Sequence, residues 1–82
     1  MIEDTYIIKR NGKREPFSME KIRNAVTKAF VSVGSFPSQE DMINILGRLS
    51  IHDGIAVEEI QNQVEKSLMA ERYYEVAKSY SL

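Results

Sequence analysis

The sequence predicts a single α+β domain, a four-helix bundle-like body capped by a small β-sheet of two to three strands that starts with an N-terminal hairpin. Three observations lead to this fold class. Two short extended segments flank an Asn-Gly pair, later segments carry apolar residues at helical spacing, and 82 residues with 43% hydrophobic content suffice for one modest core. No repeat or linker divides the chain, so residues 1–82 are expected to form one unit.

The hairpin is predicted from residues 5–9 and 13–17, which have an extended character and are separated by Asn11 and Gly12. Asn-Gly between two such segments is a strong local signal for a tight turn, because both residues tolerate a positive φ. The turn can leave two or three residues unpaired, and the residues alone leave this choice open.

A first helix is predicted from about Met19 to Ser32, with the Ser18 hydroxyl as its N-cap. Gly34 and Pro37 end it, since neither residue continues a helix well. Its apolar stripe consists of Ile22, Ala25, Val26, Ala29 and Phe30.

A second helix is predicted after Ser38, which forms a capping box with Asp41 as the acidic member. The apolar residues that follow recur at helical spacing, so they are expected to lie on one face of the helix and to face the core. They are Met42, Ile45, Leu46 and Leu49.

A turn is expected at Asp53-Gly54, and the short segment from Ile55 to Val57 is a candidate third strand. A third helix follows, with Glu58 and Glu59 in its first turn, where the helix dipole favours anions. Ala56 offers no capping oxygen. The stripe of this helix consists of Ile60, Val64 and Leu68, flanked by Val57 and Met69.

A fourth helix is outlined by Tyr73, Val76, Ala77 and Tyr80, and it reaches the last residue without a stop signal. The chain is therefore expected to be a fragment of a longer protein. Its tyrosines are expected to pack in the domain or face a partner rather than stack on a ligand.

The composition excludes several classes of function. The chain has no cysteine, so disulfides, thiolate metal sites and cysteine nucleophiles are impossible, and a cytoplasmic location is expected. No run approaches the roughly 18 apolar residues that span a bilayer, and no signal peptide is visible.

Catalytic machinery is not visible either. The one histidine, His52, stands beside Asp53 in the expected turn, which is the pattern of a surface residue more often than of a base. Glu58 and Glu59 are adjacent on a helix and diverge by about 100°, so they make poor partners for acid-base work. Phosphate-loop and dinucleotide fingerprints are absent. We expect no catalytic residues and no metal site, and any phosphate must be held by side chains.

Charge is distributed unevenly, although the net charge is only −1. Between Lys9 and Lys28 there are seven bases and two acids, while the residues from Ser35 onward carry four bases and eight acids. A local positive field of this kind suits a phosphate-bearing ligand, and the alternative is a solvated charge cluster. The candidate phosphate donors are Lys9, Arg10, Lys13, Arg14 and Lys21.

One acid, Glu15, lies among these bases and near the apolar Phe17. A carboxylate in such surroundings is usually a local ion pair. It can equally accept a hydrogen bond from the exocyclic amine of adenine.

Three segments carry a resemblance to a known family. The string Ile7-Ile8-Lys9-Arg10-Asn11-Gly12-Lys13-Arg14-Glu15-Pro16-Phe17-Ser18, followed by Glu20-Lys21-Ile22, resembles the start of the ATP-cone, the overall-activity regulatory domain at the N-terminus of the large, catalytic subunit of ribonucleotide reductases. Residues 55–61 resemble the beginning of that family's third helix, and residues 73–80 resemble its final helix.

The resemblance implies a regulatory domain that binds ATP as activator and dATP as inhibitor. Mg²⁺ is expected with the nucleotide, because bridging nucleotide phosphates is ordinary chemistry for this ion. The implied partners are adenine nucleotides, the catalytic body of the same chain and other reductase subunits, without a membrane or nucleic acid. The residues on the family's nucleotide-contact positions are Ile7, Lys9, Arg10, Glu15, Phe17, Ser18, Lys21, Ile22, Val57 and Gln61. In the family the bases face phosphates, and the hairpin acid and its neighbours read adenine.

The resemblance also selects a register for the hairpin. A two-residue turn pairs Ile8 with Glu15 and leaves Ile7 and Lys9 on the opposite face. A three-residue loop with Gly12 in the left-handed region pairs Ile7 with Glu15 and builds one site on one face. We predict the second register.

Two alternatives come from other classes of protein. One is the cone of a nucleotide-responsive transcriptional regulator, although such repressors carry a cysteine zinc ribbon and this sequence has no cysteine. The other is a degenerate cone that acts as a protein-interaction domain.

Overall fold

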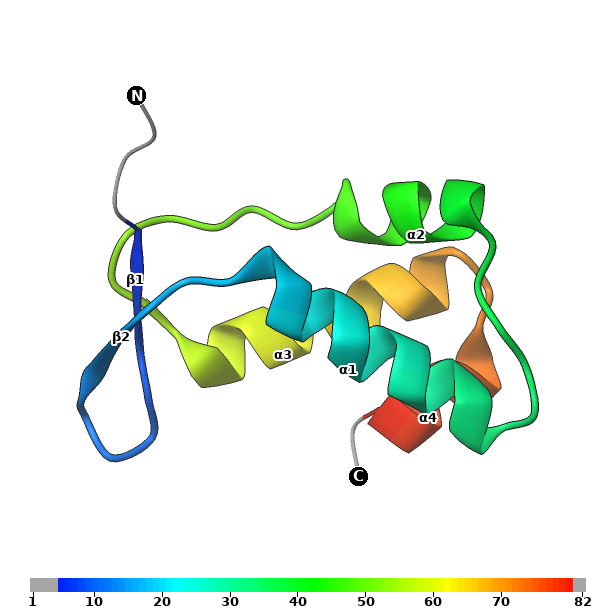
Figure 1. Ribbon diagram of the computed structural model, residues 1–82, viewed down its shortest axis with the longest axis horizontal. Coiled ribbons are helices and arrows are strands. Elements are labelled where there is room, and N and C mark those ends of the chain that lie inside the picture. The colour runs from blue at the N-terminus through cyan, green and yellow to red at the C-terminus, as the bar shows by residue number, and fades with distance from the viewer. Residues whose placement is uncertain (1–4, 81–82) are drawn as a thin grey trace.

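A computed structural model describes residues 5–80 as a helical body with a small sheet at the end where the first and third helices begin (Figure 1). This confirms the predicted α+β fold class. The elements, in chain order, are β1 (Tyr6–Ile8), β2 (Arg14–Pro16), α1 (Met19–Ser32), α2 (Gln39–Leu46), β3 (Ile55–Ala56), α3 (Val57–Ala70) and α4 (Tyr74–Tyr80). No helix within the described range is long and apolar enough to cross a membrane.

The hairpin has the three-residue loop. Ile7 lies opposite Glu15 in the antiparallel pair of β1 and β2, so the predicted register is confirmed. The Lys9 amide donates to the Lys13 carbonyl at 2.8 Å, and Gly12 has a φ of 86°. Glycine suits this position because a side chain in the left-handed region is strained.

A third strand completes the sheet, as the short segment after the Asp53-Gly54 turn suggested. β3 runs parallel to β1, and the strand order is β2-β1-β3. The turn is fixed to β1 by two hydrogen bonds, because the Tyr6 amide donates to Asp53 Oδ1 at 2.8 Å and the Gly54 amide donates to the Tyr6 carbonyl at 2.7 Å. This brings the start of α3 beside the hairpin.

The helix caps follow the sequence closely. Ser18 Oγ accepts from the Lys21 amide at the start of α1, and Ser38 and Asp41 form the reciprocal capping box of α2. α3 begins at Val57, and its N-cap residue Ala56 makes no side-chain cap hydrogen bond. The predicted stripe of α2 is wrong at Leu49, because the helix ends at Leu46 and the chain continues in tighter turns after Gly47. Leu49 still packs against the core.

The core lies between the helices, and its fully buried side chains come from three of them. They are Val26 and Phe30 of α1, Ile45 of α2, and Val64 and Leu68 of α3. The buried Ser67 donates its hydroxyl to the Ile45 carbonyl at 2.6 Å, which joins α3 to the end of α2.

Helix α4 packs against both α1 and α3. The Phe30 and Tyr73 rings meet edge to face with their centroids 5.1 Å apart. The link between α3 and α4 contains Arg72 in the left-handed region, at a φ of 71°. The fourth helix is confirmed up to Tyr80, and its expected continuation to the last residue lies outside the described residues.

Candidate functional site

Two cavities adjoin where the hairpin meets the beginnings of α1 and α3. The first has a volume of about 150 Å³ and the second a volume of about 330 Å³. Both cavities are lined by Ile7, Glu15, Val57 and Gln61, so these residues form the boundary between them.

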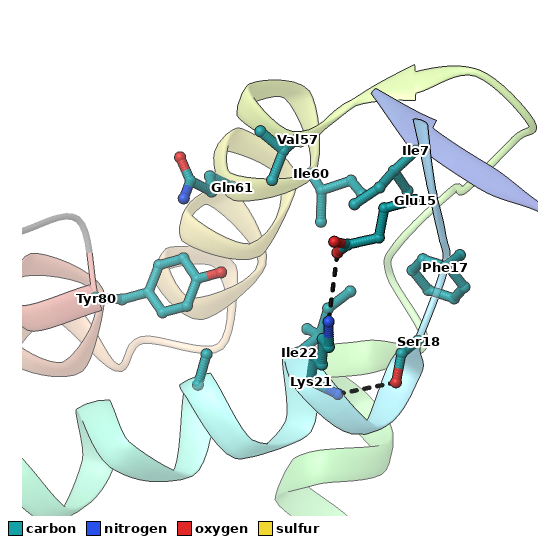
Figure 2. A pocket seen from close by; sticks show the side chains of 11 residues that line it. Ile7, Glu15, Phe17, Ser18, Lys21, Ile22, Val57, Ile60, Gln61 and Tyr80 are labelled. Carbon is teal, nitrogen blue, oxygen red and sulfur yellow. Dashed lines mark hydrogen bonds and ion pairs between the residues drawn. The ribbon is translucent and has the colours of Figure 1, made fainter. Parts of the chain in front are cut away.

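Apolar side chains form most of the first cavity. The hairpin contributes Ile7 from β1 and Phe17, and further apolar walls come from Ile22, Ala25, Val57 and Ile60 of the two helices. Figure 2 shows the Glu15 carboxylate pointing into this space toward the Lys21 ammonium. The cavity therefore combines apolar walls with one carboxylate, which suits an apolar ring that carries a hydrogen-bond donor.

The local fold explains why these side chains converge. The Phe17 amide donates to the Thr5 carbonyl at 2.7 Å, which continues the hairpin pairing by one step beyond Pro16. Ser18 then caps α1 at once, so the first turn of this helix stands next to β2. The Lys21 side chain, in the first turn of α1, therefore reaches Glu15 on β2.

Glu15 is held between two cations. Its carboxylate oxygens lie 3.5 Å from Lys9 Nζ and 3.4 Å from Lys21 Nζ, and 26% of its side chain is exposed. The hydrogen bond from Lys21, with the positive charges of Lys21 and Lys9, lowers the pKa of Glu15 below its ordinary value. The group is therefore an ionised acceptor at neutral pH.

The second cavity differs from the first in having two basic side chains in its lining. Lys9, Arg10 and Asn11 of the hairpin line it together with Gln61 of α3. The Arg10 guanidinium donates from Nη2 to Gln61 Oε1 at 2.9 Å, and its Nε lies 3.2 Å from Glu58 Oε2. These contacts join the hairpin loop to the first turns of α3.

All ten residues predicted for a nucleotide site line one or both cavities. Lys9 and Arg10 line the second cavity, and the other eight line the first: Ile7, Glu15, Phe17, Ser18, Lys21, Ile22, Val57 and Gln61. Two further candidate phosphate donors, Lys13 and Arg14, line neither. Strand alternation explains why Arg14 lies outside both cavities, because it points to the opposite face of the sheet from Glu15. Arg14 pairs with Ile8, and its guanidinium covers the Tyr6 ring at 4.3 Å.

Four lining residues were not predicted. Ala25 and Ile60 belong to apolar stripes, and helical periodicity does not distinguish a core position from a cavity wall. Asn11 was interpreted only as a turn residue. Tyr80 comes from α4, and no local pattern in the sequence indicates that this helix reaches the hairpin site.

The turn before β3 lies apart from the two cavities. His52 Nδ1 lies 3.1 Å from the Asp53 carbonyl oxygen, and the Asp53 carboxylate accepts from the Tyr6 amide. Among residues 5–80, no three His, Cys, Asp or Glu side chains are grouped so that they could hold a metal ion.

Comparison with known proteins gives a consistent result. The ATP cone domain model matches residues 5–82. Similar proteins include the anaerobic ribonucleoside-triphosphate reductase of Haemophilus influenzae, which is 38% identical over 90% of this chain, and the vitamin B12-dependent ribonucleoside-diphosphate reductase of Thermoplasma acidophilum, which is 37% identical over 93%. The ribonucleoside-diphosphate reductase subunit alpha of Chlamydia pneumoniae is 39% identical over 93% of the chain.

The matched segments make up only 11%, 11% and 8% of these three reductases, in that order. The family model, by contrast, covers nearly the whole of this chain. The chain therefore belongs to the ATP-cone domain family.

Proposed function

We propose that this domain binds ATP and dATP, and that it controls the overall activity of a ribonucleotide reductase of which it forms part. The observation that carries the proposal is a pair of adjoining cavities with different linings: the first has mainly apolar side chains around the Glu15 carboxylate, and the second adds the basic side chains of Lys9 and Arg10. Such a pair matches a nucleotide, whose base is apolar on its faces and whose phosphates are anionic.

The base is proposed to occupy the first cavity. Its faces would pack against the apolar walls formed by Ile7, Ile22 and Val57. The ionised Glu15 can only accept hydrogen bonds, so it would pair with the exocyclic amine of adenine. Guanine presents a carbonyl oxygen at the equivalent ring position and would meet the carboxylate with like polarity.

The phosphates are proposed to lie toward the second cavity, near Lys9 and Arg10. Arg10 has a planar fork of donors that suits phosphate oxygens, and the ammonium group of Lys9 adds positive charge. Mg²⁺ bridging the phosphates would accompany the nucleotide.

The regulatory part of the proposal rests on the family. ATP would act as activator and dATP as inhibitor, each favouring a different arrangement of the catalytic body in the longer protein. A nucleotide shifts such an equilibrium only by its differential affinity for the two arrangements. The relatives named above are reductases, and this supports the proposed context.

The test is isothermal titration calorimetry of the chain with ATP, dATP and GTP in the presence of Mg²⁺. We expect ATP and dATP to bind, and GTP to bind at least about tenfold more weakly, because guanine places a carbonyl oxygen against the Glu15 carboxylate where adenine places an amine donor. Glu15→Ala should reduce the preference for ATP over GTP. The matched control is Glu20→Gln, since Glu20 is exposed on α1 and lines neither cavity.

Two results would contradict the proposal. One is the absence of ATP and dATP binding to the folded chain, which would favour a degenerate cone with a protein partner. The other is salt-dependent binding of DNA in place of nucleotides, which would favour a nucleic-acid-binding module.

A further inference from the structure

Tyr80 brings α4 into the first cavity. This residue lies in the last described turn of α4, far in sequence from the hairpin, and it lines the same cavity as Glu15 and Ile22. In Figure 2 its ring enters from the side opposite the hairpin, and its hydroxyl is directed into the space between α3 and Lys21. α4 therefore supplies a wall of the cavity that the hairpin, α1 and α3 do not provide.

The Tyr80 hydroxyl has the properties of a ligand contact. None of the hydrogen bonds among residues 5–80 uses it, although the residue is only partly exposed. Burial raises the pKa of the hydroxyl, so the group keeps its proton at neutral pH and can donate a hydrogen bond. A phenol in this setting offers an apolar ring to the interior of the cavity and a donor to a polar atom within it.

The position of the ring is fixed by the packing of α4. Val76 and Ala77 are buried, and the hydroxyls of Ser32 and Ser79 join α4 to α1 by a hydrogen bond. Tyr74, on the same helix, has 58% of its surface exposed and lines neither cavity. The two tyrosines therefore differ in environment although they belong to one short helix.

We infer that Tyr80 is a nucleotide-binding residue, whose ring packs against the nucleoside and whose hydroxyl donates a hydrogen bond to it. This inference rests on the proposed function. The contact is with the base and sugar rather than the phosphates, because Lys9 and Arg10 line the other cavity and Tyr80 does not. A bound nucleotide would then touch the hairpin, α1, α3 and α4 together, so α4 would respond to its presence.

The experiment measures ATP and ADP binding to the full 82-residue chain by calorimetry, for the wild type, Tyr80→Phe, Tyr80→Ala and the matched control Tyr74→Phe. Tyr80→Phe should weaken binding about fivefold, as expected for the loss of one hydrogen bond, and by the same factor for both nucleotides. Tyr80→Ala should weaken it further because the ring is also lost, and Tyr74→Phe should change nothing. In the wild type, ATP should slow amide hydrogen exchange in residues 77–80.

The outcomes separate the inference from the function on which it rests. If the wild type binds ATP and Tyr80→Phe binds it equally well, the hydrogen bond is refuted and the proposed function stands. If Tyr80→Ala also binds like the wild type, the ring contact is refuted as well. A loss that is much larger for ATP than for ADP would assign Tyr80 to the phosphates and overturn the inference. A folded wild type that binds neither nucleotide overturns both proposals.

Discussion

Glu58→Gln is expected to strengthen ATP binding, because Glu58 and a nucleotide compete for the same arginine. The Arg10 guanidinium lies 3.2 Å from the Glu58 carboxylate and lines the cavity proposed for the phosphates. When Arg10 turns toward a phosphate, it gives up some or all of its contact with Glu58. The carboxylate would also repel a polyphosphate placed beside Arg10. Removing its charge while keeping its shape eliminates both effects.

The size of the effect follows from the exposure of the pair. The Arg10 and Glu58 side chains are 67% and 52% exposed, so the solvent screens their interaction strongly. Exposed ion pairs contribute about 0.2–1 kcal/mol, which corresponds to a factor of about 1.4 to 5 in affinity. We therefore expect the Glu58→Gln chain to bind ATP about two- to fivefold more tightly, and the gain to shrink as salt is added.

The assay is calorimetric titration with ATP at about 50 mM and about 300 mM salt, which span strong and weak screening. Glu65→Gln is the control, because Glu65 lies about two turns further along α3, roughly 10 Å away, and lines neither cavity. In an Arg10→Ala background, the gain from Glu58→Gln should fall, since the competition is then absent. Unchanged or weaker ATP binding by Glu58→Gln at low salt would show that Glu58 does not compete with the nucleotide for Arg10.

Three predictions concern stability. Ser67→Ala should lower the free energy of unfolding by about 1 kcal/mol in urea denaturation, because the Ile45 carbonyl loses its buried donor; no change would mean that this bond is dispensable. Arg72→Gly should raise the free energy of unfolding by about 0.5–1 kcal/mol, because glycine adopts a positive φ without strain and its larger chain entropy in the unfolded state cancels only part of this gain. A lower urea midpoint would contradict the prediction. The third prediction concerns pH. The hydrogen bond from the Tyr73 hydroxyl, with those from Ser38, lowers the pKa of Asp41 below 3.8. The stability that the Asp41 carboxylate contributes is therefore complete above pH 3.8 and is lost as the pH falls through the pKa of Asp41 in the folded protein. The same hydrogen bond raises the pKa of Tyr73 above 10.0, so the stability that the Tyr73 hydroxyl contributes is lost as the pH rises through the pKa of Tyr73 in the folded protein. Thermal unfolding of Asp41→Asn should therefore show a weaker loss of stability in acid than the wild type, and equal acid slopes would count against this assignment.

Local chemistry in the sequence was sufficient for most of the secondary structure. Asn11-Gly12 predicts the hairpin because few residues other than glycine tolerate the positive φ found at Gly12. Ser38 with Asp41 predicts the start of α2 because they satisfy free amides there. α1 was predicted with the bounds that the structure gives. The prediction failed at Leu49, where apolar spacing continued beyond the end of the helix.

The fold class, the turns and caps, and a concentration of positive charge around one acid could be predicted from the sequence, because each depends mainly on residues close together in the chain. Its local patterns left the hairpin register open, and the resemblance to a family was needed to select one. Two features became visible only in the folded domain: Tyr80 reaches the cavity beside Glu15, and Arg10 contacts Glu58 and Gln61. Periodicity in the sequence indicates which face of a helix is buried, but the residues that this face contacts depend on how distant elements pack.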